Sequence, residues 1–412
     1  MNRREVKRAP VLRFKGFTND WEQHTLGDFG SVAMNKRIFK NQTTDKGDVP
    51  FFKISTFGKK ADSFISNNLF EKYKEKYPYP QKGDLLISAS GSIGRIVEYK
   101  GQKAYYQDSN IVWLNHNKEL LNIYLKAYYQ VIHWHGIEGS TIKRLYNKNI
   151  LATSIFVPDK KEQYELGRLI KKAEKIISLQ QRKLKLLKLL KQGMLQNLFT
   201  SKDTPILRFY GFYDILKQYK LSHLFYVNGR IGFRGYTRKD IISKNEGGIW
   251  AISPINIQDN CLVSLHNNTY ITKAKYEESP EIQLRPSYSL LVKTGSTLGK
   301  SAYINNLYEP ATINPQIAVL KPINKKISKY LGYILTTDNF LQQITALKIG
   351  GAIPTLTERD LKEVKLYIVP DTKEANKISN FLNKLDVIIG FQQKNINNLH
   401  QVKKFLFQNM FI

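Results

Sequence analysis

The 412-residue sequence has a single cysteine, Cys261, and no apolar run of the ~18 residues that a membrane-spanning helix needs. One cysteine excludes an internal disulfide and a cysteine-built zinc site, which fits a reducing compartment, and we expect a cytoplasmic protein. The basic residues Arg3, Arg4, Lys7 and Arg8 are followed by Pro10 and lack an apolar core. They therefore predict a basic tail and not a signal peptide.

Acidic residues are scarce relative to basic ones. The sequence has 34 Asp and Glu against 64 Lys and Arg, a formal net charge of +30, together with 24 Tyr and 21 Phe. An excess of positive charge spread along the chain favours a polyanionic partner, and nucleic acid is the first candidate. A merely basic protein without such a partner is the alternative.

The sequence contains segments that match motifs for catalysis and cofactor binding only in part. The segment 294–301 (TGSTLGKS) places Thr294 where a P-loop needs its first glycine. Residues 314–317 (NPQI) depart at the third position from the Asn-Pro-Pro-aromatic loop of DNA methyltransferases, and the seven histidines show no metal-binding spacing. We therefore expect a chain that is not an enzyme, with no catalytic residues and no metal.

What the sequence contains is a long repeat. Residues 158–200 place seam residues at alternating spacings of four and three, which predicts a long amphipathic helix, and residues 370–412 repeat the pattern about 212 positions later. Each helix would be roughly 60 Å long. The central seam residues are Ile177, Gln180, Leu184, Leu187, Lys191 and Met194 in the first helix, and Ile389, Gln392, Ile396, Leu399, Lys403 and Leu406 in the second.

The polar seam residues indicate how the two helices pack. In a parallel pair, Lys191 would face Lys403, burying like charges against each other. In an antiparallel pair, Gln180 can accept a hydrogen bond from Lys403, and Gln392 from Lys191. We therefore predict an antiparallel coiled coil with a pseudo-twofold internal repeat. If both lysines instead reach solvent, they leave the direction undecided.

The repeat extends into the segments before the helices. Residues 11–17 (VLRFKGF) return as 206–212 (ILRFYGF), and two segments with strand, glycine turn and strand correspond at 82–95 and 290–300. The frameworks agree while the polar loops differ, so two α+β domains would read different parts of a ligand. The predicted order is a basic tail (1–10), a first globular domain (11–157), a spacer helix (158–200), a second globular domain (201–369) and a second spacer helix (370–412).

This organisation resembles the specificity subunits of type I restriction-modification enzymes over essentially the whole chain. The residues that carry the resemblance are Trp21-Glu22 with Leu26-Gly27-Asp28, the segment 82–87 (KGDLLI) on to Gly94, the segment 156–163 (FVPDKKEQ), Ile176-Ile177, the helix up to Phe199, and the second set at 368–411. The second copy departs from the pattern, because residues 213–224 lack the Trp-Glu and Leu-Gly-Asp pairs.

The resemblance implies that the globular domains are target recognition domains, each reading one half of a bipartite, asymmetric site on double-stranded DNA. It also implies that the helices recruit two methyltransferase subunits and that two restriction/translocase subunits complete the complex. S-adenosylmethionine, ATP and Mg²⁺ would then be bound by those other subunits, and no cofactor by this chain. A stand-alone DNA-binding or scaffold protein is the alternative, and a nuclease the third.

Candidate DNA contacts are polar and basic residues on or beside predicted turns, where their side chains can reach base edges or phosphates. In the first domain they are Lys36, Arg37, Lys53, Ser90, Ser92, Arg95, Asn110, Lys143 and Arg144. In the second domain they are Arg230, Arg234, Arg238, Lys293, Thr294, Ser296, Thr297, Lys300 and Gln316. For each residue, a solvated position without DNA contact is the alternative.

Overall fold

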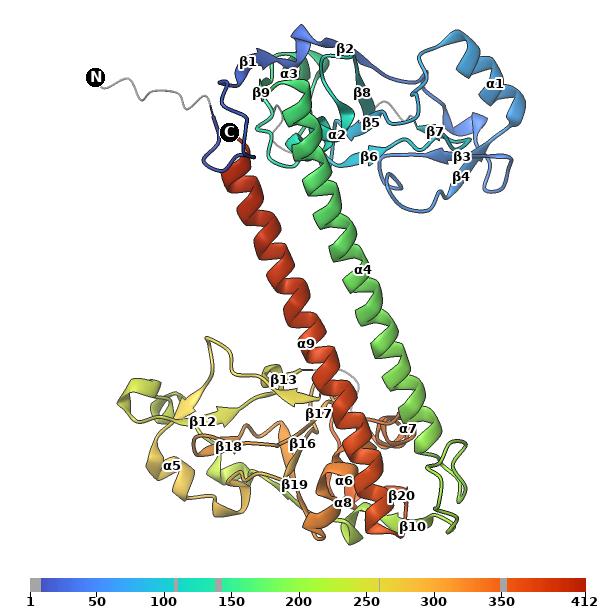
Figure 1. Ribbon diagram of the computed structural model, residues 1–412. Coiled ribbons are helices and arrows are strands. Elements are labelled where there is room, and N and C mark those ends of the chain that lie inside the picture. The colour runs from blue at the N-terminus through green and yellow to red at the C-terminus, as the bar shows by residue number, and fades with distance from the viewer. Residues whose placement is uncertain (1–8, 107–109, 138–142, 259, 349–353) are drawn as a thin grey trace. The chain divides into compact units, whose positions relative to one another are not determined.

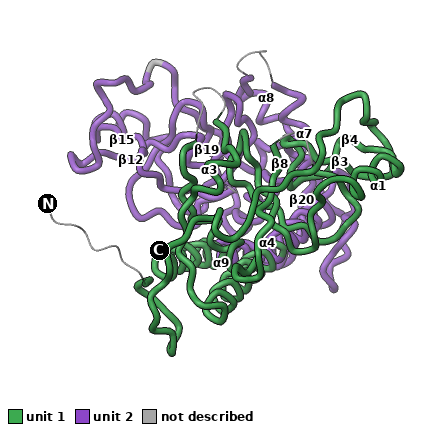
Figure 2. Tube along the Cα trace, turned by 90° about the horizontal axis from the view of Figure 1, so that it is seen from above, with its two compact units in different colours: residues 1–182, 394–412 green, residues 183–393 purple. Residues whose placement is uncertain are grey.

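The computed structural model describes residues 9–106, 110–137, 143–258, 260–348 and 354–412 (Figure 1). Most of the predicted basic tail lies outside these ranges. The chain divides into two compact units (Figure 2): unit 1 is Met1–Arg182 with Lys394–Ile412, and unit 2 is Lys183–Gln393. No helix within the described ranges is both long and apolar enough to cross a bilayer.

Unit 1 is built on a four-stranded antiparallel sheet, with strands in the order β2 (Gly30–Ala33), β8 (Ile111–His116), β5 (Leu85–Ser88) and β6 (Ile96–Glu98). A three-stranded sheet has the order β4 (Ser63–Ile65), β3 (Val49–Phe52) and β7 (Tyr105–Tyr106), and β1 (Glu22–Thr25) pairs with β9 (Ser154–Val157). Its short helices are α1 (Asn67–Lys76), α2 (Asn122–Tyr128) and α3 (Asn147–Leu151). Every residue of β5 is buried, so this strand packs against apolar residues on both faces.

Unit 2 repeats this plan strand for strand. Its four-stranded sheet has the order β11 (Phe225–Gly229), β19 (Ile317–Pro322), β16 (Ser289–Val292) and β17 (Ser301–Tyr303). The three-stranded sheet is β15 (Tyr270–Ile271), β12 (Ile249–Ile252) and β18 (Ala311–Ile313), and β10 (Lys217–Lys220) pairs with β20 (Lys365–Ile368). The pairing senses also match, since β3 with β7 and β12 with β18 are the parallel pairs of the two three-stranded sheets.

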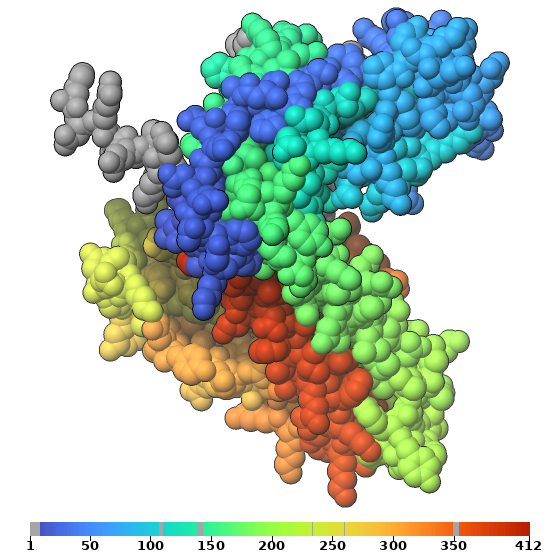
Figure 3. Space-filling view, turned by 45° about the horizontal axis from the view of Figure 1, so that its top comes forward, coloured from blue at the N-terminus to red at the C-terminus, as the bar shows by residue number. Residues whose placement is uncertain are grey.

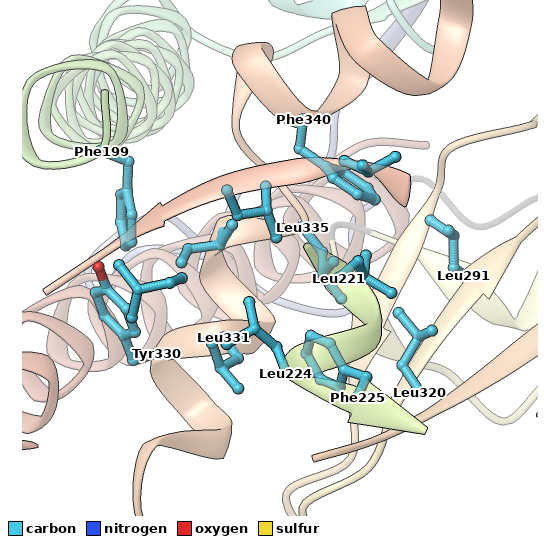
Figure 4. Close-up of a cluster of buried hydrophobic side chains, with 14 of the residues drawn as sticks. Phe199, Leu221, Leu224, Phe225, Leu291, Leu320, Tyr330, Leu331, Leu335 and Phe340 are labelled. Carbon is cyan, nitrogen blue, oxygen red and sulfur yellow. The ribbon is translucent and has the colours of Figure 1, made fainter. Parts of the chain in front are cut away.

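The remaining elements of unit 2 are short. They are the hairpin β13 (Ile257–Gln258) and β14 (Cys261–Leu262), and the helices α5 (Lys273–Glu277), α6 (Ser328–Ile334), α7 (Asp338–Ala346) and α8 (Glu358–Glu363). Leu221, Phe225 and Leu320 pack with Leu331 of α6 and Phe340 of α7 in the main core (Figure 4). The predicted α+β fold with an internal repeat is confirmed. The residue boundaries of the predicted domains stay a prediction.

Two long helices accompany these sheets, α4 (Lys160–Leu198) and α9 (Thr372–Met410), each of 39 residues. In unit 1, Leu166 and Ile170 near the start of α4 share a core with Met410 at the end of α9. In unit 2, Leu198 at the end of α4 shares a core with Ile378 near the start of α9. Each unit therefore holds the two helices antiparallel, as predicted.

The predicted polar partners along the seam are wrong. Lys403 donates to Glu174 at 2.8 Å and not to Gln180, and Lys191 pairs with Asp386 at 2.5 Å and not with Gln392. Both lysines contact a carboxylate, whose negative charge adds Coulomb attraction to the hydrogen bond, and Lys403 also donates to the Gln130 amide oxygen at 2.9 Å. All twelve predicted seam residues are nevertheless buried or half-buried.

The repeated N-terminal motif acquires a structural role in both units. In unit 1, the Arg13 guanidinium donates two hydrogen bonds to the buried Glu162 carboxylate of α4, at 2.8 and 2.7 Å. In unit 2, Arg208 donates to the buried Glu374 of α9 at 2.7 Å from each of two nitrogens.

The residue before each arginine is fastened to the other long helix. Leu12 N donates to Asn409 O at 2.8 Å, and Leu207 N donates to Asn197 O at 2.9 Å. The motif thus ties the start of one helix to the end of the other in each unit, which explains why its sequence occurs twice.

Candidate nucleic-acid interface

The candidate site in unit 1 lies where the loop after β5 meets the segment that leads into α3. Ala89 N donates to Asn110 O at 2.7 Å, Leu145 N donates to Ala89 O at 2.9 Å, and Ser90 forms a β-bridge with Arg144. These backbone bonds bring Asn110 and Arg144 together from segments far apart in the sequence.

Unit 2 holds the same junction with different side chains. Lys293 N donates to Gln316 O at 2.8 Å, Leu356 N donates to Lys293 O at 2.8 Å, and Thr294 bridges Thr355. The matching bonds align Ala89 with Lys293, Asn110 with Gln316, and Arg144 with Thr355. Continuing along the chain, Asn147 of α3 aligns with Glu358 of α8, and Lys148 with Arg359.

A glycine turn shapes one side of each junction. Gly94 in the β5–β6 turn has φ +79°, and Gly299 in the β16–β17 turn has φ +92°, a region that favours glycine. Gly94 N donates to Ser88 O at 3.0 Å, and Gly299 N donates to Val292 O at 2.9 Å. The turns present the predicted site residues Ser92, Arg95, Ser296, Thr297 and Lys300.

In unit 1 the junction opens into a hollow of about 650 Å³. It is lined by Met34, Ala89, Asn110, Val112, Arg144, Leu145, Tyr146, Asn147 and Lys148. None of these nine described residues is acidic, and within the described ranges Arg144 forms no ion pair. An exposed guanidinium beside two side-chain amides offers the groups that bind guanine and adenine edges in a DNA groove.

In unit 2 the corresponding position carries an ion pair. Lys293 Nζ lies 3.1 Å from Glu358 Oε1, with the two side chains 16% and 36% exposed. The pair lies over Gly229, where an added Cβ would collide with the Glu358 carboxylate and come within 2.7 Å of the Lys293 ammonium. Thr357 caps α8 by accepting from Asp360 N at 3.0 Å, which fixes the backbone that carries Glu358.

The structure places the predicted DNA contacts in three classes. The exposed ones are Lys36, Arg37, Ser92, Lys143, Arg144, Arg238, Ser296, Lys300 and Gln316. The half-buried ones are Lys53, Arg95, Asn110, Arg234, Lys293, Thr294 and Thr297. Ser90 and Arg230 are buried. The contacts of all eighteen residues with DNA stay a prediction.

Arg230, predicted to contact DNA, is buried and makes internal contacts. Its guanidinium donates to Ile313 O at 3.2 Å and to Thr312 Oγ1 at 3.1 Å, and stands over the Tyr236 ring at 5.4 Å. Burial lowers the pKa of Arg230. The side chain turns inward and holds β18 through these two hydrogen bonds.

Other basic candidates also have partners, and Arg234 donates to Glu278 O at 3.0 Å. Lys53 Nζ lies 2.9 Å from Asp62 Oδ1, and this ion pair lowers the pKa of the Asp62 carboxyl. Arg95 donates to Phe57 O at 3.0 Å.

Sequence reasoning missed Tyr146, Asn147 and Lys148 in unit 1 and Glu358 and Arg359 in unit 2. A signal was present, because residues 145–151 (LYNKNIL) and 356–362 (LTERDLK) begin at aligned leucines and differ at polar positions. Within the described residues, no three of His, Cys, Asp and Glu gather in a way that could hold a metal.

Comparison with known proteins finds one family. The sequence pattern of the type I restriction modification DNA specificity domain matches residues 18–189 and 234–401. A type I restriction enzyme specificity subunit of Haemophilus influenzae, S.HindORF215P, is 54% identical over 150 residues, which are 36% of this chain and 39% of that protein. The alignment thus spans about two-fifths of the relative's length. The MjaVIII specificity subunit of Methanocaldococcus jannaschii is 20% identical over 93% of this chain and 90% of its own.

Two solved structures share the fold. The S subunit of a type I restriction-modification system from M. genitalium superposes with a TM-score of 0.61 at 14% identity, covering 98% of this chain and 99% of that one. A chain from a study of complex assembly and conformational transition in a type I system gives 0.56 at 14% identity, covering 95% and 98%.

Proposed function

The chain belongs to the type I restriction-modification DNA specificity family, and from this premise we propose that its two units read the two halves of a bipartite, asymmetric DNA site. The observation that carries the proposal is the pair of aligned junctions. Their backbone bonds match, yet the side chains differ: Thr355 of unit 2 is equivalent to Arg144 of unit 1, and Glu358 is equivalent to Asn147. Equal frameworks with unequal reading groups suit unequal half-sites, and the net charge of +30 supplies phosphate contacts.

The long helices support a second part of the proposal, the partners. In unit 1, Ile176 and Leu179 of α4 are 46% and 53% exposed. In unit 2, Ile388 and Phe391 of α9, which occupy the same places in the repeat, are 45% and 64% exposed. A flank of α9, drawn in red, is open to solvent in Figure 3. Exposed apolar stripes of this kind mark protein interfaces.

Because the exposed stripe occurs once in each copy of the repeat, we assign it to two copies of one partner, the methyltransferase subunit. A stand-alone protein would leave both stripes in water. In this assembly the chain is the non-catalytic subunit, restriction/translocase subunits join it, and S-adenosylmethionine, ATP and Mg²⁺ belong to the other subunits. A cytoplasmic location, beside the DNA, is part of the same proposal.

The proposal is tested by expressing the chain with the methyltransferase of its own host. We expect a purified complex with two methyltransferase copies per chain, measured by native mass spectrometry. Sequencing of modified bases in the expressing cells should give one motif with two specified halves separated by unspecified bases. A chain that purifies alone, or a single uninterrupted motif, would contradict the proposal.

A further inference from the structure

The ion pair between Lys293 and Glu358 is not required by the framework that holds it. Unit 1 builds the same junction, with the same backbone hydrogen bonds, from Ala89 and Asn147 at these two positions. The pair is only half-buried, and a Cβ at Gly229 beneath it would require the ends of the Lys293 and Glu358 side chains to shift. A feature that one copy of a fold has and the other lacks, at an accessible place, points to function more than to stability.

The backbone around the pair is held firmly. Lys293 N donates to Gln316 O, and Lys293 O accepts from Leu356 N, both at 2.8 Å. Glu358 begins a helix that Thr357 caps. Side chains on fixed backbone keep the geometry that recognition of a base needs.

The two side chains present a donor next to an acceptor. In the major groove a G·C pair presents the guanine O6 and N7 acceptors next to the cytosine N4 donor. Lysine donates to the first and glutamate accepts from the second. The ammonium also offsets the carboxylate charge, which DNA phosphates would otherwise repel.

We propose that Lys293 and Glu358 together read one G·C base pair in the half-site of unit 2. The inference rests on the proposed function, and it adds an acidic residue to the reading surface of a strongly basic chain. Unit 1, which has Asn147 and Arg144 at this junction, reads its own half-site with other groups.

The test maps modified bases genome-wide in cells that express the whole complex with Glu358→Gln or Lys293→Met. Both variants should lose discrimination, by about tenfold or more, at the same G·C position of one half-site. The control is Glu309→Gln, which removes the acid of another Lys–Glu pair of unit 2, Lys244 to Glu309 at 2.7 Å. This control should leave the motif unchanged.

Several outcomes overturn the inference. They are an unchanged motif in both variants, relaxation at different positions, and loss of all modification by variants whose thermal unfolding matches the wild type. A lower unfolding temperature in Lys293→Met alone leaves Glu358→Gln as the deciding variant. If the wild-type complex itself modifies no bipartite motif, the proposed function fails, which is a separate result.

Discussion

At the scale of single residues, burial separates arginines with internal partners from basic side chains that stay accessible to a ligand. The guanidinium groups of Arg13 and Arg208 donate hydrogen bonds to buried carboxylates, and that of Arg230 donates to the backbone of β18. Arg144 and Lys300 stay exposed. The sequence alone could not show which of these residues are buried, because the local sequence around an arginine does not determine whether its side chain points into the protein or into solvent.

The buried pair of Arg13 and Glu162 gives the first prediction. Arg13→Met leaves a carboxylate with 1% side-chain exposure without its cation, so the free energy of unfolding should fall by about 3 kcal/mol. Arg168→Met, which breaks the surface pair with Glu165, should cost about 0.5 kcal/mol or less. Urea denaturation of the full chain measures both changes. If Arg13→Met lowers the free energy of unfolding by no more than Arg168→Met does, the buried pair does not stabilise the fold.

Alkaline pH provides the second prediction. Burial raises the pKa of Tyr106 to about 12, above the ordinary value of 10. The folded state therefore favours the neutral phenol. Its contribution to stability is complete below about pH 10 and is lost as the pH rises towards about 12.

Tyr106→Phe removes this titrating group and keeps the ring. Between pH 10 and 12, the variant should lose less stability than the wild type, measured by urea unfolding followed by circular dichroism. Identical pH profiles would assign the alkaline loss to other groups.

At the scale of elements, the long helices were the most predictable feature. Their apolar period fixed 158–200 and 370–412 as helical, and the observed helices begin and end within two residues of these bounds. The partners of Lys191 and Lys403 were not predictable from the seam. They are Asp386 and Glu174, which lie outside the predicted heptad seam.

The exposed stripes give the prediction for this scale. Leu179→Asp in unit 1 and Phe391→Asp in unit 2 should each lower the number of bound methyltransferase subunits from two to one, because a carboxylate would be buried at one interface. Ser178→Asp, at the exposed neighbouring position of α4, is the control. Native mass spectrometry counts the copies, and two copies retained by both stripe variants would exclude these stripes as the interface.

At the scale of the whole molecule, the internal repeat carried most of the information. Aligning the two copies predicted the α+β units and the two helices, and it placed Asn110 and Arg144 on turns that the fold then brings together. It did not reveal Glu358, because a search for DNA contacts in a basic chain selects basic and neutral side chains. Only the matched hydrogen bonds show that this acid stands where Asn147 stands in the other copy.

The central claim is that each unit reads its own half-site. The most direct measurement replaces residues 1–157 by the first recognition domain of another family member and maps the modified bases in cells that express the hybrid with its partners. The account predicts that one half of the motif changes to that of the donor protein while the other half stays the same. A hybrid that folds and modifies DNA with both halves changed, or with neither changed, would contradict it.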